Sequence, residues 1–274
     1  MNVLGTTLAA LSTSGEGEVH FPPSADSFWQ PLVVLGHLGS QTIAITRPMV
    51  VMTLTVIGIS WWLVATTKRS AVVPSKGQWF TEQIYNFVRN DVARDSIGTK
   101  DFMRFVPLLF SMFILILVNN WMGIIPPVQL PTMGRIGFPI ALTLVVYAVY
   151  HWIGIQKHGA VGYLKVMVPP GLPGWLIPFV FVLELMTFFV TRPLTLALRL
   201  FGNMFAGHLL LAVFIVGGAE LFMSDAIGLK LVAIPAWIMA FAMTLFEALV
   251  QFLQAYVFVL LAASYLGGAL SDEH

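Results

Sequence analysis

The sequence predicts an all-α integral membrane protein with five membrane-embedded helices plus an interfacial amphipathic helix. Of its 274 residues, 58% are hydrophobic and only 10% are charged, whereas a typical soluble domain carries about 25% charged residues. Several apolar runs reach the roughly 20 residues that a helix needs to cross a bilayer. These runs are continuous, unlike the alternating strands of a transmembrane β-barrel. The chain is therefore expected to cross a membrane repeatedly as helices.

The N-terminal segment, residues 1–42, is polar and rich in turn residues, and the membrane domain is expected to cover residues 43–274. Continuous apolar runs bounded by charged or proline-containing stretches mark the first three spans. They are predicted at about 43–66, 102–125 and 136–155. A linker rich in glycine and proline is expected to follow, at 157–173.

Between the first two spans, an amphipathic helix is predicted at about 78–95. Its large apolar residues recur near helical spacing, from Trp79 and Phe80 to Val92, and charged residues such as Glu82 and Arg89 fall elsewhere. This pattern is typical of a helix lying in the membrane interface. A soluble cytoplasmic helix would give the same pattern, because length does not discriminate between them.

Two further apolar segments, at about 175–216 and 229–270, are roughly twice as long as one span requires. Each is either a strongly tilted helix or a pair of spans joined by a tight turn. In the first segment Pro193 is the candidate turn residue. The second has Pro235 near its start and no further breaker before Gly267. We therefore interpret both segments as long, tilted helices.

The distribution of basic residues predicts the orientation of the chain, because cytoplasmic loops carry an excess of lysine and arginine. The first and third connections between spans contain most of them, and the opposite side contains few. The N-terminus is accordingly expected outside and the C-terminus in the cytoplasm. The cytoplasmic set is Lys68, Arg69, Lys76, Arg89, Arg94, Lys100, Arg104, Lys157 and Lys165, and the opposite set is Arg47, Arg135 and Lys230.

Arg199 is the residue that most strongly indicates a function. Apolar sequence continues on both sides of it for long enough to place it within the membrane, and a guanidinium stays charged at physiological pH. Insertion of such a charge at mid-membrane costs roughly 2.5–3.5 kcal/mol, and such residues usually line a wet cavity or meet a partner. The alternative is an arginine near a helix end whose head reaches the lipid headgroups.

Helical spacing sorts the other polar residues of the two long segments into faces. Thr195, Arg199 and Asn203 are four residues apart and share a stripe, whereas His208 lies nine residues after Arg199 and points to roughly the opposite side. On the last segment a second polar face is predicted. It consists of Glu247, Gln251 and Gln254, with Tyr265 on the same line.

These two faces suggest one permanent positive charge and one set of groups that can exchange protons along a hydrated path, namely His208 and Glu247. Each of these polar residues also has a purely structural interpretation. His208 alone would suit a hydrogen-bonded contact between helices, and Gln254 would suit helix packing. Glu184 either neutralises Arg192, eight residues later, or faces a cytoplasmic vestibule.

No other chemistry is predicted from the residues. The chain has no cysteine, and its six histidines lack the spacing of a metal site. We expect no cofactor, no metal and no catalytic site. With a net charge of +1 and no basic, aromatic stretch, no nucleic-acid partner is expected either.

The sequence resembles subunit a of the F-type ATP synthase. The long stretch from Arg192 to His208, RPLTLALRLFGNMFAGH, is similar to the signature of that family. Gln254 to Phe258 (QAYVF) resembles its last-helix motif, and Phe113 to Pro126 (FILILVNNWMGIIP) its second-span motif. The resemblance covers the chain in order and spacing from about Ile43, and it leaves the segment to Gly39 uncovered.

The resemblance implies a proton-translocating stator subunit of the Fo motor in a bacterial plasma membrane. Such a subunit grips a rotating c-ring, whose hairpins each carry one mid-membrane carboxylate, and forms two offset aqueous half-channels. Arg199 would stand between the half-channels, attract each arriving carboxylate and block direct proton leakage. The implied partners are the c-ring, the peripheral-stalk subunit b, other ATP synthase subunits and membrane lipid.

The same resemblance assigns roles to individual positions. Asn203 and Gln254 match polar positions near the arginine, and Glu184 matches an acidic residue of the cytoplasmic side. His208 and Glu247 match the outer half-channel pair. Many bacterial relatives carry the carboxylate on the first long helix and the histidine on the second, so the two types are exchanged here. The exchange leaves the order of proton transfer between His208 and Glu247 open.

Two other functions fit parts of the sequence. One is a free-standing secondary transporter that binds an anion at a midplane arginine. The absence of internal repeats argues against it. The other is a structural scaffold whose charges only pair helices. Proton-driven ATP synthesis after loss of Arg199 separates the scaffold from the stator.

Overall fold

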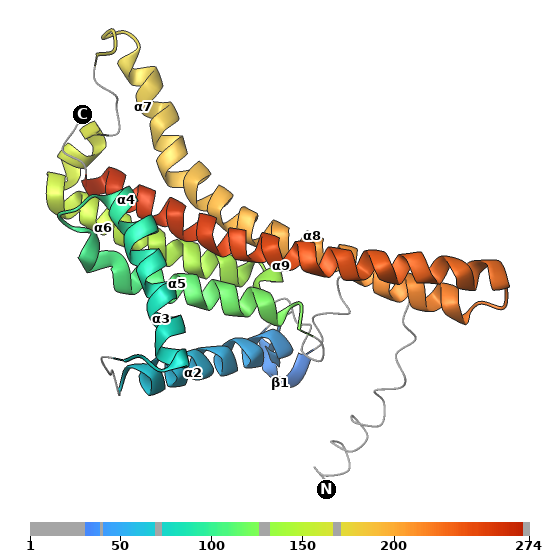
Figure 1. The fold of residues 1–274 in the computed structure, drawn as a ribbon. Coiled ribbons are helices and arrows are strands. Elements are labelled where there is room, and N and C mark those ends of the chain that lie inside the picture. The colour runs from blue at the N-terminus through green and yellow to red at the C-terminus, as the bar shows by residue number, and fades with distance from the viewer. Residues whose placement is uncertain (1–30, 39–40, 69–72, 126–131, 167–170, 271–274) are drawn as a thin grey trace, which may run out of the picture. The chain divides into compact units, whose positions relative to one another are not determined.

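The computed structural model describes residues 31–38, 41–68, 73–125, 132–166 and 171–270. Five of its helical runs are long and apolar enough to cross a membrane. The predicted all-α membrane fold is thereby confirmed (Figure 1). The described residues divide into two compact units, which are treated separately below.

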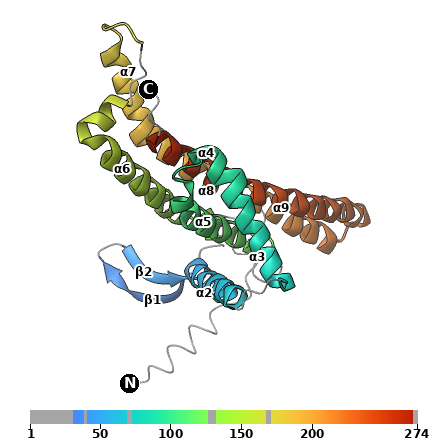
Figure 2. The same ribbon diagram turned by 60° about the vertical axis from the view of Figure 1, so that its left-hand side comes forward.

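The larger unit, residues 30–208 and 244–274, begins with a feature that the sequence analysis missed. Strands β1 (Pro31–Leu38) and β2 (Gln41–Thr46) form an antiparallel hairpin beside the start of α2 (Figure 2). The expectation that the first span begins at residue 43 is therefore wrong. Helix α2 covers Arg47–Thr67. Pro48 lies in its first turn, where a missing N–H costs no helical hydrogen bond.

The predicted amphipathic segment is a run of three helical pieces: α3 (Lys76–Asn86), the π-helix η2 (Phe87–Arg94) and α4 (Asp95–Ile97). Ser75 caps the run, because its hydroxyl accepts a hydrogen bond from the Gln78 amide at 3.3 Å. The second span is α5 (Phe102–Met122), which packs against η2 and α2. A short 3-10 turn, η3 (Thr132–Gly134), precedes the third span.

The third span differs from the expectation at its end. Helix α6 covers Gly137–Val166, although residues 157–166 were expected to belong to a linker. Within it, Gly159 has φ 70°, a non-helical conformation at which two helices meet in a kink. Because the chain bends at this glycine, Tyr163 returns to His151, and the two side chains meet at 3.0 Å between the hydroxyl and Nδ1.

The first long segment is helical without a loop. It consists of α7 (Ile177–Met186), the π-helix η4 (Thr187–Thr191) and α8 (Arg192–Met223), so Pro193 does not create a turn. The last helix, α9 (Ile227–Leu270), is unbroken despite Pro235. The interpretation of each segment as two hidden spans is therefore wrong. Helix α8 also continues seven residues beyond the expected end at 216.

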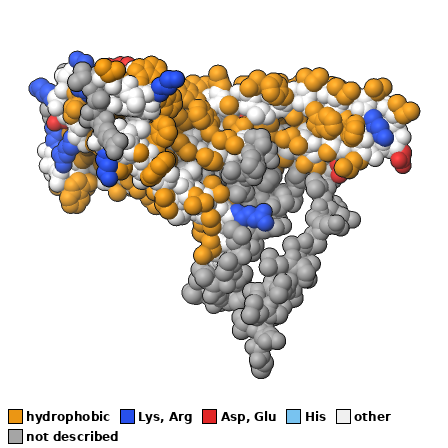
Figure 3. Space-filling view, turned by 60° about the horizontal axis from the view of Figure 1, so that its bottom comes forward, with side chains coloured by type: hydrophobic (Ala, Val, Ile, Leu, Met, Phe, Trp, Pro, Cys, Tyr) orange, Lys and Arg blue, Asp and Glu red, His pale blue; other side chains and the backbone are white. Residues whose placement is uncertain are grey.

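The smaller unit contains, among its described residues, the helical hairpin of residues 209–243. Trp237 packs in it against Gly218 and the ring of Phe222, whose centroid is 5.4 Å away. In the space-filling view, apolar side chains cover most of the visible described surface and charged groups are few (Figure 3). A surface of this kind is expected for a chain whose solvent is lipid.

The core of the larger unit lies around α5. Phe113 and Ile116 are almost completely buried there, together with Val88 of η2 and Phe258 of α9. A polar cluster adjoins this core, because Asn119 accepts hydrogen bonds from the hydroxyls of Thr55, at 3.0 Å, and Thr132, at 3.2 Å. The amide of Asn119 thus ties α2, α5 and η3 together.

Gly267 allows α9 to approach α4 at backbone distance. A Cβ placed on Gly267 would lie 2.2 Å from the Ser96 carbonyl oxygen, which no rotation of a side chain can relieve. We expect Gly267→Ala to destabilise the fold by about 1–3 kcal/mol, the usual cost of overpacking. Thermal unfolding in detergent measures this loss. Gly268→Ala is the matched control, because its Cβ would meet nothing within 4 Å, and an equal loss in both variants would contradict the prediction.

Candidate functional site

The part of α8 that belongs to the larger unit presents two distinct faces. Leu196, Leu200, Met204 and His208 recur every four residues and are buried at 8% exposure or less. This face meets α9, because Met204 Sδ lies 3.6 Å from Gln251 Nε2. The packing fixes the rotation of α8 about its axis and thereby the direction of its opposite face.

The opposite face carries Thr195, Arg199 and Asn203, and all three are exposed on the surface of the chain. Helical spacing predicts this stripe, and the packing of the buried face turns it outward. Across the described ranges, no hydrogen bond or ion pair to Arg199 occurs. The guanidinium of Arg199 is therefore presented to whatever surrounds the chain.

On α9 the predicted polar face is buried. Glu247, Gln251 and Gln254 are 4%, 3% and 4% exposed. Gln251 Nε2 donates to Glu247 Oε1 at 2.9 Å, and Asn203 Nδ2 donates to Gln254 Oε1 at 2.6 Å. The second bond links the exposed stripe of α8 to the buried polar row of α9.

Glu247 lies directly against the backbone of α8. A Cβ placed on Gly207 would be 2.8 Å from Glu247 Oε1 and 3.0 Å from its carboxyl carbon. Only a glycine leaves room for the carboxylate at this position. The absence of a side chain at Gly207 therefore decides where the carboxyl group of Glu247 lies. Gly207 directly precedes the buried His208 in the sequence.

Several atoms of the buried polar row have no hydrogen-bond partner within the described part of the chain. They are Glu247 Oε2, Gln251 Oε1 and Gln254 Nε2. A buried polar atom without a partner typically costs about 1–3 kcal/mol. In folded proteins such atoms are usually satisfied by ordered water.

Glu184 and Arg192 do not form the ion pair that one interpretation of the sequence suggested. The Arg192 guanidinium lies over the Phe188 ring at 3.5 Å and within 5.1 Å of the Tyr265 ring centroid. Glu184 is half-buried on α7, and no salt bridge between these two side chains is formed in the described structure. The charge of Arg192 is therefore stabilised by aromatic rings rather than by a carboxylate.

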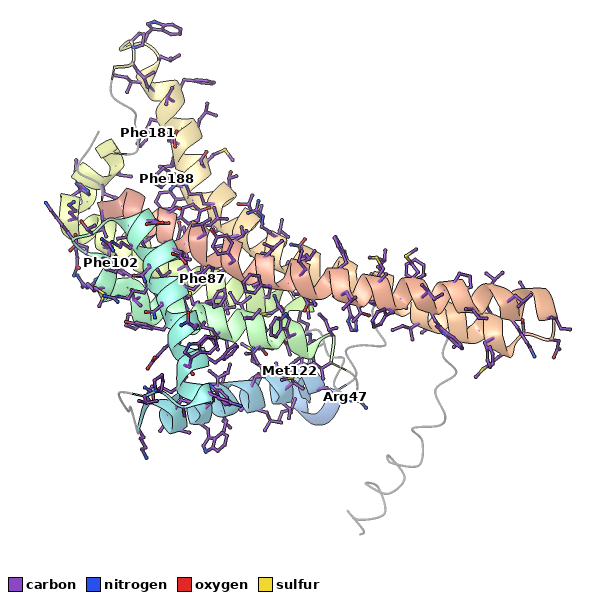
Figure 4. The ribbon with its side chains drawn as sticks, in the orientation of Figure 1. Arg47, Phe87, Phe102, Met122, Phe181 and Phe188 are labelled. Atoms are coloured by element: carbon purple, nitrogen blue, oxygen red, sulfur yellow. The ribbon has the colours of Figure 1, made fainter. Side chains whose placement is uncertain are left out.

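A second polar cluster was not found from the sequence. His151 is 9% exposed and stacks on Phe189 at 4.8 Å between ring centroids. Tyr150 donates from its hydroxyl to the Phe188 carbonyl at 3.1 Å. Phe188, labelled in Figure 4, thus contacts both residues: its carbonyl accepts the bond from Tyr150, and its ring lies under the Arg192 guanidinium. The only sequence signal was a histidine within an apolar span, which is ambiguous by itself.

The described side chains include no group of three or more metal-ligating residues. The site therefore combines a permanent cation, Arg199, on the exposed face of α8 with a buried row on α9. The row contains one carboxylate, Glu247, and two amides, Gln251 and Gln254. Such a site suits the movement of protons past a fixed charge rather than bond-breaking chemistry.

Known proteins are similar to this chain over most of its length. Residues 48–267 match the family model described as ATP synthase A chain. The chain is 43% identical over 276 residues to a protein of Nocardioides sp., covering 98% of this chain and 100% of that relative. It is 42% identical over 230 residues to one of Pseudarthrobacter chlorophenolicus (84% and 86%) and 37% over 248 residues to one of Brucella ovis (90% and 96%). All three relatives are named ATP synthase subunit a.

Proposed function

Since the chain belongs to the ATP synthase A chain family, we propose that it is the stator against which the c-ring of the Fo motor turns. Family membership makes it a multi-pass membrane component of the F-type ATP synthase that serves proton transport and ATP synthesis, without a catalytic site of its own. In the proposal, Arg199 separates two aqueous half-channels that open to opposite sides of the membrane.

The observation that carries the proposal is the exposure of Arg199 on a long helix that is mostly apolar. A rotor carboxylate that arrives about 4 Å from this guanidinium gains roughly 4 kcal/mol of Coulomb energy at an effective dielectric constant of 20. The interaction favours the ionised form of the carboxylate, so the rotor acid gives up its proton beside Arg199. A proton cannot pass from one half-channel to the other past this fixed positive charge.

His208, Glu247 and Gln251 form the outer half-channel in this proposal. Their burial on the α8–α9 contact, and the atoms of Glu247 and Gln251 that lack partners among the described residues, support this assignment. Protons enter through this row and reach the rotor acid next to the exposed stripe. Because histidine and glutamate are exchanged relative to many bacterial relatives, either one can be the final donor.

Asn203 and Gln254 are proposed to hold the polar environment around Arg199. Their 2.6 Å hydrogen bond links the α8 stripe to α9 one turn after Arg199. Glu184, half-buried on α7, is proposed for the half-channel of the cytoplasmic side. In the same proposal the N-terminus lies outside and the C-terminus in the cytoplasm, which is the orientation that the basic residues predict.

The lengths of the last helices support a strong tilt. A straight helix of 44 residues, the length of α9, is about 66 Å long, roughly twice the 30 Å hydrocarbon core. It fits in one bilayer only when it lies steeply inclined. If α8 and α9 are inclined together, a long side of the pair faces the rotor, as the proposed contact with the c-ring requires. Their other sides are then left for subunit b.

Cysteine cross-linking tests which face meets the rotor, because the chain contains no cysteine. In the intact complex, we expect Thr195→Cys and Ala206→Cys, on the exposed stripe, to form disulfides with a cysteine placed one turn from the rotor carboxylate. Leu196→Cys and Leu200→Cys are the matched controls, because these positions are buried against α9. Equal cross-linking from both faces, or none from the stripe, would overturn the proposed rotor contact.

A further inference from the structure

An apolar groove lies on the larger unit between α2, the α3–η2 run and α5, and none of the residues of the proton path proposed above lines it. Its volume is about 840 Å³. Figure 4 labels two residues of its lining, Phe87 on η2 and Met122 at the end of α5, of which Met122 is near α2 in that view. Other lining side chains are large and apolar, among them Trp62, Phe80, Ile84, Phe113, Trp121 and Phe252.

The size and chemistry of the groove limit what can fill it. An α-helix of 10–12 Å diameter occupies roughly 500 Å³ per turn, so a partner helix lying along the groove would be only partly inside it. Water requires two to four polar partners at a buried site, and this lining is almost entirely hydrocarbon. A flexible hydrocarbon chain fits both limits, since 840 Å³ lies in the usual range of small-molecule sites.

One end of the groove is polar and basic. Trp62 Nε1 donates to Thr81 Oγ1 at 3.1 Å, and Gly77 packs against Thr66 and Trp62, which brings the start of α3 onto the end of α2. Lys68 lies two residues after Thr66 and Lys76 directly before Gly77, so both are next to this crossing, and both are exposed. Exposed lysines at the end of an apolar groove attract a negatively charged headgroup.

We propose that this groove is a binding site for an anionic phospholipid. One acyl chain fills the space between α2, η2 and α5, and the phosphate lies on Lys68 and Lys76. Tryptophan at the polar end suits this position, because indole rings favour the level of the headgroups. The two lysines give the site a preference of about thirtyfold for anionic over zwitterionic lipid.

The proposal depends on the membrane location of the chain and not on the proposed proton path. It is tested on the intact complex in nanodiscs that contain equal amounts of phosphatidylglycerol and phosphatidylcholine. The complex is then washed in detergent, and the retained lipids are counted by native mass spectrometry. We expect one phosphatidylglycerol per copy of this chain to resist the wash, with little phosphatidylcholine in its place.

Two variants separate the groove from the headgroup site. Gly58→Phe projects a ring into the groove, because a Cβ on Gly58 meets nothing within 4 Å, and it should abolish retention, whereas Gly58→Ala should not. Exchange of Lys68 and Lys76 for glutamine should lower the phosphatidylglycerol preference to near one. Lys100→Gln is the matched control, since Lys100 is exposed in the turn before α5 and is not next in sequence to the α2–α3 crossing.

Three outcomes would overturn the inference. Unchanged retention in Gly58→Phe would show that the lipid lies elsewhere, and equal retention of the two lipids by the unmodified chain would remove the role of the lysines. A photoactivatable probe on Gly58→Cys that attaches to another subunit instead of lipid would show that a protein covers the groove. Proton pumping by the same complexes, measured after reconstitution into sealed vesicles, keeps these outcomes distinct from a failure of the proposed proton path.

Discussion

Replacement of Arg199 by alanine is expected to abolish proton-driven ATP synthesis, with a loss of about a thousandfold. The estimate follows from the roughly 4 kcal/mol that a guanidinium contributes to an ionised carboxylate at 4 Å, since each 1.4 kcal/mol is a factor of ten. ATP synthesis and ATP-driven proton pumping in membrane vesicles measure the loss. The amount of assembled complex should stay normal, because Arg199 forms no hydrogen bond or ion pair with the described residues.

Two comparison variants sharpen the Arg199 result. Arg199→Lys keeps the charge but loses the planar fork of the guanidinium, so it should keep more activity than Arg199→Ala. Arg192→Ala removes a cation from the same helix that is stacked on Phe188 and Tyr265, and we expect it to affect stability more than proton flux. Normal ATP synthesis by the Arg199→Ala complex would remove Arg199 from the mechanism.

Replacement of Glu247 by glutamine is expected to slow proton flux by about a hundredfold, the lower end of what a positioned acid or base contributes. Glutamine keeps the shape of the side chain and its contact with Gln251, yet it cannot release a proton. Pumping rates in vesicles, normalised to the amount of assembled complex, measure the effect. A Glu247→Gln complex that pumps at the normal rate would exclude this carboxylate from the outer half-channel.

The position of the Glu247 carboxylate can be tested without changing Glu247 itself. Gly207→Ala places a Cβ 2.8 Å from Glu247 Oε1, so the carboxylate must move, and proton flux should fall, though less than in Glu247→Gln. Gly202→Ala is the matched control on the same helix, because its Cβ would have no neighbour within 4 Å. Equal fluxes in the two alanine variants would show that the contact with Gly207 does not matter.

Helical periodicity was sufficient to predict the faces of the long helices. Thr195, Arg199 and Asn203 share a stripe, and Glu247, Gln251 and Gln254 share another, because residues three or four apart lie on one side of any α-helix. Periodicity was not sufficient to say which stripe is buried, since apolar residues surround both. The buried face of α8 follows from its packing on α9, and this packing turns Arg199 outward.

Contacts between helices could not be predicted, because they depend on register and on bends rather than on local pattern. The bond between Asn203 and Gln254 joins residues that are 51 positions apart. The pair formed by His151 and Tyr163 exists because Gly159 adopts a positive φ inside α6. The strand hairpin before α2 was missed because β1 and the start of β2 lie in a segment interpreted as polar and rich in turns, and only the end of β2 falls in the predicted first span.

By itself, the sequence determined that this protein crosses a membrane as helices, that a permanent charge lies within one of them, and which family's motifs it carries. Composition and periodicity carry that information because the bilayer penalises every unsatisfied polar group. Only the tertiary structure decided that the carboxyl group of Glu247 lies against Gly207, that Arg199 is exposed, and that α2, η2 and α5 enclose a groove. Those features arise where segments far apart in the chain pack together, and there the shape of each neighbour, more than its polarity, sets the position of a side chain.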